Sequence, residues 1–346
     1  WKKKRQKPLN RQKSKLKKSS GNSTVRIVYA GSPDISAVPL EFLLQEGRHE
    51  VAAVLTNPPS MQGRSKELVP TPVALAAMKE NEKRSPESQI PILTPERLNG
   101  SVRRYIGSLH CDILVCFAYG KIFGPKFLSL FPKGGINLHP SLLPKYRGCA
   151  PVPAAILNRD EETGITVQRL AQEMDCGDIL LQKKIALNGR ETAQTLLDTA
   201  STMGGPMLSQ VLCQIEDGTV KAVKQAGNAC YCTMLCKNDG CIDWNESALN
   251  IDARIRAFTP WPGAYTRVEE TVLRIHEAFV YDHSVQPEHQ HLPNGTVIGV
   301  DKARGILVKT GDGILVLTNL QWQSKKAMHW KDFLNGSKNF IGLQCM

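Results

Sequence analysis

The sequence has no hydrophobic run long enough to cross a membrane. Runs such as Ile113–Ala118 fall far short of the ~18 residues that a spanning helix needs. It also lacks a collagen-like glycine period, a heptad array and low-complexity stretches beyond its first residues. These absences exclude a fibrous protein, a membrane-spanning protein and a disordered scaffold. What remains is a chain of 346 residues, 41% apolar and 22% charged, which has the length of about two domains with their own cores.

Acidic residues are missing from residues 1–24, which contain ten Lys and Arg residues. The chain has a net charge of +12, but the rest of it carries 34 basic and 32 acidic side chains, so the excess belongs to this tail. A segment so basic and so poor in apolar residues is expected to be disordered and to adhere to RNA or anionic surfaces. Two other interpretations are a transit peptide, which the excess of Lys over Arg disfavours, and an artefact of the translation start.

The ten cysteines lack the spacing of a structural zinc site, which usually has two C-x2-4-C pairs some distance apart. The one close group, between Cys230 and Cys241, has the spacing C-x-C-x3-C-x4-C instead. Small buried thiols scattered through a protein of a reducing compartment are the simpler interpretation. With no signal peptide evident, we expect a cytoplasmic protein without a bound metal.

Apolar runs alternate with helical stretches in the first two thirds of the chain. The predicted strands are 25–30, 50–56, 111–118, 135–138, 165–170 and 179–185, and the clearest predicted helices are 38–45 and 191–216. This alternation is typical of βαβ units, so we predict an α/β fold with a Rossmann-like, mostly parallel sheet. Ligands of such sheets bind beyond the carboxyl ends of the strands, so functional residues are expected in the loops that follow them.

The pattern changes after about residue 218. Short apolar runs are then interrupted by Gly, Pro and Asp about every ten residues, which predicts a small β-barrel. The predicted barrel strands are 264–268, 271–275, 295–300, 305–309 and 313–317. We therefore expect four regions. They are a basic tail at 1–24, a catalytic domain at 25–218, a linker at 219–245 and an OB-like C-terminal β-barrel domain at 246–346.

Candidate catalytic residues follow the strand at 135–138. Alternation places Asn137 and His139 on one face of this strand, at its carboxyl end. An amide can stabilise an oxyanion and an imidazole can carry a proton, which suits acyl transfer. Asp175 lies in a turn between two later strands, where it can orient the histidine or act as a base. Alone these features are weak, because most such histidines are simply packed and most such aspartates only form turns.

The wider sequence resembles the folate-dependent formyltransferases, whose active site contains N-x-H-x-S-L-L-P and a downstream D-x-G-D. Residues 137–144 and 175–178 match these motifs. Other segments look like the methionyl-tRNA formyltransferase branch of that family. They are AGSPD at 30–34, GRSKELVPTPV at 63–73, FAYGKI at 117–122, YRGCAP at 146–151, AFTPWPGAYT at 257–266, GDG at 311–313 and LQWQSKKAM at 320–328. The resemblance covers about residues 25–335 in order.

The resemblance implies a reaction and a site. The reaction is transfer of formyl from 10-formyltetrahydrofolate to the α-amine of methionine esterified to initiator tRNA, with no metal needed. The implied catalytic residues are Asn137, His139 and Asp175, and the implied folate-binding residues are Ser141, Leu142, Leu143 and Pro144. In that chemistry the first two stabilise the tetrahedral oxyanion. The aspartate positions the histidine and helps to remove the amine proton.

The resemblance also implies a tRNA contact through the loop 57–72, which contains Arg64 and Lys66. This loop is more basic in the family, where Gly is usual at the place of Ser65 and Lys at that of Glu67. Cations of the barrel region can add phosphate contacts. They are Arg254, Arg256, Lys302, Arg304, Lys325 and Lys326. The close group of cysteines stands where the family has Ala or Ser in its linker, so we interpret the thiols as substitutions.

Three other functions are compatible with parts of this sequence. A glycinamide ribonucleotide formyltransferase shares the HPSLLP run, but it lacks a second domain. A sugar-nucleotide formyltransferase can carry both the catalytic residues and a barrel, so it is the main alternative. A non-catalytic RNA-binding protein would use the tail and barrel, but it would not need Asn137, His139 and Asp175. The expected partners are initiator methionyl-tRNA and the folate, with no membrane, and the expected state is a monomer.

Overall fold

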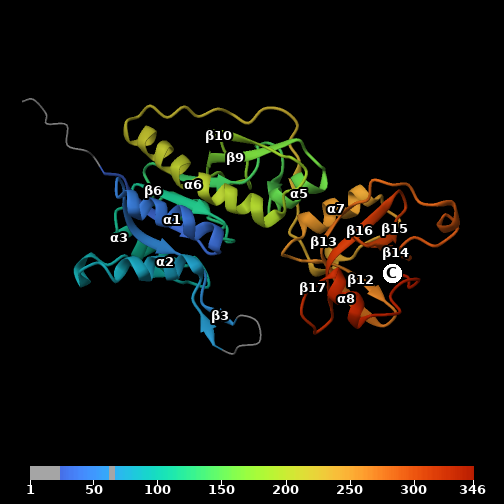
Figure 1. Ribbon diagram of the computed structural model, residues 1–346. Coiled ribbons are helices and arrows are strands. Elements are labelled where there is room, and N and C mark those ends of the chain that lie inside the picture. Colours follow the sequence, from blue (N-terminus) through green and yellow to red (C-terminus); the bar gives the residue numbers. More distant parts are fainter. Residues whose placement is uncertain (1–23, 62–66) are drawn as a thin grey trace, which may run out of the picture.

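The computed structural model describes residues 24–61 and 67–346 of the chain. Figure 1 shows a body coloured from blue to yellow beside a second body coloured orange and red. Each body contains its own large sheet. The predictions for residues 1–23 of the tail, and for Arg64 and Lys66, concern residues outside the described ranges.

The first body is built on a seven-stranded sheet of order β10-β9-β7-β6-β1-β2-β5. Its strands are β1 (Arg26–Gly31), β2 (Glu50–Leu55), β5 (Ile92–Leu93), β6 (Ile113–Phe117), β7 (Gly135–His139), β9 (Glu162–Arg169) and β10 (Ile179–Ala186). Strands β5, β2, β1, β6 and β7 are parallel to one another, whereas β9 pairs antiparallel with both β7 and β10. The predicted mostly parallel α/β sheet is therefore confirmed, with one reversed strand.

Helices cover both faces of this sheet (Figure 1). On one face lie α1 (Asp34–Glu46), α2 (Pro72–Asn81) and α6 (Ala193–Glu216), and on the other lie α3 (Gly100–Ser108) and α4 (Pro125–Leu128). Alternation along β1 explains how one strand contributes to the cores on both faces. Ile27 and Tyr29 join the core under α1, α2 and α6, and Val28 and Ala30 join the core under α3 and α4. Strands buried on both faces read as continuous apolar runs, which is why they were visible in the sequence.

The second body is an antiparallel sheet consistent with the predicted small barrel. Its strand order is β12-β13-β16-β15-β14, and β17 pairs with β16. These strands are β12 (Ala264–Val268), β13 (Thr271–Val280), β14 (Val297–Asp301), β15 (Gly305–Lys309), β16 (Ile314–Trp322) and β17 (Met328–His329). Together with α7 (Ala248–Ala257) and α8 (Trp330–Gly336) they enclose the barrel core, which includes Trp244, Trp330 and Phe340.

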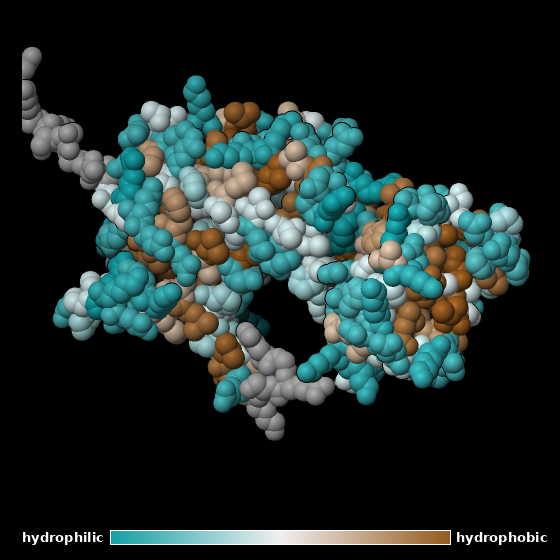
Figure 2. All heavy atoms as spheres, in the orientation of Figure 1, coloured by the Kyte–Doolittle hydropathy of each residue, from teal (hydrophilic) through white to brown (hydrophobic). Residues whose placement is uncertain are grey.

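A small apolar cluster joins the two bodies. Helix α5 (Pro151–Leu157) packs against α7, and Val152 and Ile156 lie in one cluster with Leu196 and Phe258. Below this contact, Figure 2 shows the surface hollowed between the region of α2 and the barrel. The contact between the two bodies therefore includes the apolar cluster around α5 and α7.

The segment after α6 crosses the upper side of the first body in Figure 1 before it reaches the barrel. Along this path β11 (Tyr231–Cys232) pairs in parallel with β8 (Arg147–Gly148), a short strand that follows β7. The remaining elements are the hairpin β3 (Ser60–Met61) with β4 (Leu68–Val69) and the 3-10 turns η1 (Pro86–Ser88), η2 (Lys237–Gly240) and η3 (Pro287–His289). No helix in the described part of the chain combines the length and hydrophobicity that crossing a lipid bilayer requires.

Candidate active site

Asn137, His139 and Asp175 meet at the carboxyl end of β7. Two residues apart on this strand, Asn137 and His139 project from the same face. The Nδ1 of His139 lies 3.6 Å from Oδ1 of Asp175, and the Nδ2 of Asn137 lies 3.5 Å from the same oxygen. The His139 residue is only 4% exposed, so its ring is largely removed from bulk water. The structure thus brings together the three residues predicted as catalytic.

A backbone carbonyl determines which ring nitrogen of His139 carries a hydrogen. Nε2 lies 2.8 Å from the carbonyl oxygen of Tyr146. Since a carbonyl oxygen only accepts hydrogen bonds, Nε2 is the donor, and in the neutral ring Nδ1 is then the acceptor. Nδ1 is also the atom that faces Asp175. The nitrogen without a hydrogen in the neutral ring therefore lies on the side of the carboxylate. The sequence alone could not show this contact, because it involves only the main chain of Tyr146.

The carboxylate of Asp175 is held by two donors that no motif in the sequence indicates. Gln168 Nε2 donates to its Oδ1 at 2.7 Å, and the backbone N–H of Gly148 donates to its Oδ2 at 2.9 Å. Because β9 runs antiparallel to β7, Gln168 stands directly opposite Asn137. Asp175 itself has a φ of 54°, in the left-handed region that non-glycine residues seldom occupy. This conformation turns its side chain back toward the sheet.

The predicted folate-binding turn, residues 141–144, follows His139 directly. Ser141 is fully buried, and its hydroxyl donates to the carbonyl of Lys145 at 2.6 Å, so this side chain shapes the turn. Two further side chains support the turn from the sheet. Thr166 Oγ1 donates to the Ser141 carbonyl at 2.7 Å, and Gln182 Nε2 donates to the Leu143 carbonyl at 2.9 Å. These hydrogen bonds therefore hold the main chain of the turn in shape.

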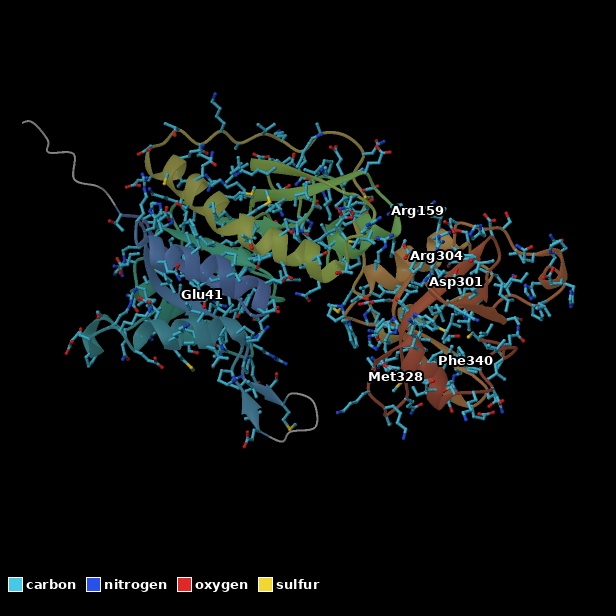
Figure 3. All side chains as sticks on the ribbon, in the orientation of Figure 1. Glu41, Arg159, Asp301, Arg304, Met328 and Phe340 are labelled. Carbon is cyan, nitrogen blue, oxygen red and sulfur yellow. The ribbon has the colours of Figure 1, made fainter. Side chains whose placement is uncertain are left out.

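Three of the arginines predicted to contact phosphates are paired with acids. Arg254 bonds Glu246 at 2.8 Å and Arg256 bonds Asp252 at 2.8 Å. On the barrel, Arg304 bonds Asp282, and Figure 3 shows it close to Asp301. Such pairing lowers the charge that these side chains offer to a polyanion. The other predicted cations of this region, Lys302, Lys325 and Lys326, are exposed.

Two of the clustered cysteines contact the segment beside His139. Cys230 Sγ accepts a hydrogen bond from the Tyr146 N–H at 3.1 Å, and Cys232 Sγ accepts one from the Ala150 N–H at 3.3 Å. Burial raises the pKa of the Cys232 thiol, which keeps it protonated at neutral pH. Across residues 24–61 and 67–346, no three His, Cys, Asp or Glu side chains are grouped in a way that would hold a metal ion.

Two family models match this chain. Residues 23–212 match the model described as formyl transferase, and residues 234–338 match its C-terminal domain. Among curated proteins, the methionyl-tRNA formyltransferase of Treponema denticola is 46% identical over 92% of this chain and 98% of its own length. The protein of the same name from Borrelia hermsii is 36% identical over 92% of this chain and 99% of its own length.

Solved structures with the same architecture are more distant in sequence. An N-formyltransferase from Helicobacter canadensis, in complex with folinic acid and dTDP-3-aminofucose, is 19% identical with a TM-score of 0.60, over 85% of this chain and 99% of its own. HypX from Aquifex aeolicus, in complex with tetrahydrofolic acid, is 13% identical with a TM-score of 0.61, over 92% of this chain and 48% of its own. These likenesses concern the fold. By its family models and its curated relatives, the chain belongs to the formyl transferase family, among the methionyl-tRNA formyltransferases.

Proposed function

We propose that this chain transfers the formyl group of 10-formyltetrahydrofolate to the α-amino group of methionyl-initiator tRNA, giving N-formylmethionyl-tRNA for translation initiation. The relatives named methionyl-tRNA formyltransferase match it over nearly their whole length. The observation that carries the chemistry is the convergence of Asn137 and His139 on one oxygen of Asp175. An amide, an imidazole and a carboxylate at this spacing suit attack of an amine on a formyl carbon.

His139 acts as the base in this proposal, whereas the family resemblance implies that it stabilises the oxyanion together with Asn137. Its Nε2 hydrogen is occupied by the Tyr146 carbonyl, so Nδ1 takes the proton as the amine attacks. The imidazolium that forms has the carboxylate of Asp175 3.6 Å away, which stabilises the charge. The same proton then passes to the folate nitrogen as its bond to the formyl carbon breaks, so no proton is left over. An N-formyl donor is already activated, so the chain supplies positioning and proton transfer.

Asn137 stabilises the oxyanion that develops on the formyl oxygen. One hydrogen of its amide is directed to Asp175 at 3.5 Å, and the other is available to the reacting oxygen. Loss of one such donor typically costs about 10²–10³ in rate. The donor's ring system would lie along residues 141–144. There Ser141, Leu142, Leu143 and Pro144 provide a turn that Thr166 and Gln182 already hold in shape.

The tRNA contacts are part of the proposal. Arg64 and Lys66 belong to the connection between β3 and β4, and we assign them to the acceptor arm as the family resemblance implies. The exposed lysines of the barrel region would add phosphate contacts that do not read sequence. The basic residues 1–24 would add a further non-specific attraction for RNA.

We propose the corresponding division of the chain into a catalytic domain at 25–218, a linker at 219–245 and a tRNA-binding domain at 246–346. The positions of the cores support it, since both cores of the seven-stranded sheet lie within Val25–Val220 and the barrel core spans Ile242 to Cys345. The catalytic side chains all come from one chain, so a monomer suffices. The ten cysteines are all free thiols, which suits the cytoplasm.

A formyl-transfer assay tests the proposal directly. Purified protein would receive 10-formyltetrahydrofolate with methionyl-initiator tRNA, methionyl-elongator tRNA or an amino-sugar nucleotide. We expect formylation of the initiator substrate, and its loss in His139→Ala. Transfer to the sugar alone would overturn the tRNA substrate and favour the sugar-nucleotide alternative, for which structural neighbours such as the Helicobacter canadensis enzyme provide the fold. RNA binding without any transfer would favour the non-catalytic alternative.

A further inference from the structure

Gln225 is an inward-facing side chain in an otherwise exposed stretch. It belongs to the segment between α6 and β11. Within residues 221–230 of this segment every residue is exposed except Gln225, which is half-buried. The preceding residues are anchored to the sheet, because Val223 forms an antiparallel bridge with Ile179 at the start of β10. The amide of Gln225 thereby faces the loop that carries Asp175.

Both ends of this amide are fully engaged. Its Nε2 donates to the backbone carbonyl of Asp175 at 2.7 Å and to that of Gly177 at 2.8 Å. Its Oε1 accepts from the guanidinium of Arg147, from Nε at 3.0 Å and from Nη2 at 2.7 Å. One side chain therefore closes the Asp175 turn and ties it to the strand β8.

The Asp175 turn has a conformation that needs such support. Asp175 sits at a φ of 54°, a left-handed conformation that is strained for a residue with a Cβ atom. Two residues on, Gly177 lies so close to the sheet that a Cβ there would stand 1.8 Å from the Arg169 carbonyl oxygen. The turn is thus pressed against β9 on one side, and Gln225 bonds its carbonyl groups on the other.

Arg147, the β8 residue that Gln225 bonds, lies between two residues whose main chains contact the proposed catalytic groups. Before Arg147, the Tyr146 carbonyl accepts from His139, and after it, the Gly148 N–H donates to Asp175. The guanidinium of Arg147 is itself held by the Tyr231 hydroxyl at 3.1 Å and lies over that ring. Movement of Arg147 would therefore shift the partners of both groups.

We propose that Gln225, supplied by the linker, is a positioning residue that keeps the Asp175 carboxylate in register with His139. This rests on the proposed function, since it assigns Asp175 a role in the transfer. Gln225 acts through the turn and touches no reacting atom. A displacement of about 1 Å at a catalytic group can cost about 10²-fold in rate, so loss of this amide is expected to lower kcat by about 10- to 100-fold.

Two substitutions separate the donor from the shape of the side chain. Gln225→Met keeps the length and removes all hydrogen bonding. Gln225→Glu keeps the acceptor for Arg147 but removes the N–H groups that reach Asp175 and Gly177. We expect both to lower kcat by about 10- to 100-fold, with KM for either substrate changed less than threefold. The matched control is Asn228→Ala, which removes an exposed amide from the same segment and should leave both constants unchanged.

The decisive measurement combines each substitution with Asp175→Asn. If Gln225 acts through the carboxylate, its loss has little further effect on the residual single-turnover rate of Asp175→Asn. A general loosening of the structure would lower both rates by the same factor and would overturn the proposal. So would a wild-type kcat in Gln225→Glu, which would show that the N–H donors are not needed. Should Gln225→Met fail to fold, Gln225→Glu provides the same comparison.

The proposed function is judged separately by the wild-type protein. Absence of transfer to methionyl-initiator tRNA in the wild type would contradict the proposed function. If the wild type formylates another amine, the Gln225 series is measured with that acceptor, and the same outcomes decide it.

Discussion

The proposed catalytic side chains come from two structural settings, a strand and a loop. Asn137 and His139 project from β7, an interior strand of the sheet, which pairs with β6 and β9. Asp175 projects from a loop of nine residues, 170–178, whose backbone is in the left-handed region at that position. We refer to these as the strand side and the loop side.

The difference lies in what holds each side in place. On the strand side, pairing with two neighbours fixes the direction in which each side chain points. On the loop side, a few hydrogen bonds from Gln168, Gly148 and Gln225 replace that regular pairing. Losing one of these bonds is therefore expected to affect the geometry of the site more than losing one bond of the sheet.

The largest expected effect tests the charge on the loop side. Asp175→Asn keeps a side chain of the same size but removes the carboxylate that faces His139. We expect kcat to fall by about 10²- to 10⁴-fold, because the imidazolium loses its counter-charge. Glu173→Gln removes an exposed charge from the same loop and serves as the control. Steady-state formylation measures both, and equal rates for Asp175→Asn and wild type would remove Asp175 from the mechanism.

The next effect concerns the buried partner of the carboxylate. Gln168 is 1% exposed and donates to Asp175 Oδ1 at 2.7 Å. We expect Gln168→Leu to lower kcat by about 10-fold or more and the free energy of unfolding by about 1–3 kcal/mol, since buried polar partners are left unsatisfied. Formylation kinetics and urea unfolding measure the two effects. A stability loss with unchanged kcat would mean that the loop side is held without Gln168.

A smaller and different effect is expected from the support of the folate turn. Gln182 Nε2 donates to the Leu143 carbonyl and to Thr166 Oγ1, both at 2.9 Å. Gln182→Leu should raise KM for the folate by about 3- to 10-fold and leave kcat nearly unchanged, because it alters binding and not proton transfer. Initial rates at varied folate concentration give both constants. If kcat falls instead, the turn and the loop side are coupled more closely than their contacts indicate.

The smallest effect is the alkaline stability of β6, the strand that pairs with the strand side. Cys116 stands opposite Asn137 in the register of β6 and β7, and burial raises the pKa of its thiol to about 12. The pKa of an unfolded thiol is about 8.5, so the neutral thiol stabilises the fold fully below that pH and progressively less as the pH rises toward 12. Between pH 9 and 10, we expect the free energy of unfolding to fall by up to about 1 kcal/mol more in wild type than in Cys116→Ala. Urea unfolding at both pH values measures this, and equal slopes would contradict it.

The strand side was largely predictable from the sequence. The sequence-based strand at 135–138 corresponds to β7 at Gly135–His139, and alternation alone placed Asn137 and His139 on one face. The barrel strands 264–268 and 305–309 coincide with β12 and β15. These strands were predictable because burial on one face leaves an alternating apolar pattern in the sequence and burial on both faces leaves a continuous apolar run.

The loop side was predictable only as far as Asp175. The reversal of β9 brings Gln168 opposite Asn137, and strand patterns do not encode the direction of pairing. Gln225 lies 50 residues beyond Asp175 in a stretch with no periodicity. The tautomer of His139 depends on a main-chain carbonyl, which any residue would supply. Such contacts arise only from the assembled fold.

The pairing of β8 with β11 limits how the molecule can be dissected. A fragment that ended at residue 218 would retain every strand of the seven-stranded sheet and all three proposed catalytic side chains. It would lack Gln225 and the strand Tyr231–Cys232, and with them the outer partners of Arg147. The smallest autonomous catalytic fragment is therefore expected to extend past Cys232, so the boundary of the chemistry lies further along the chain than the boundary of the sheet.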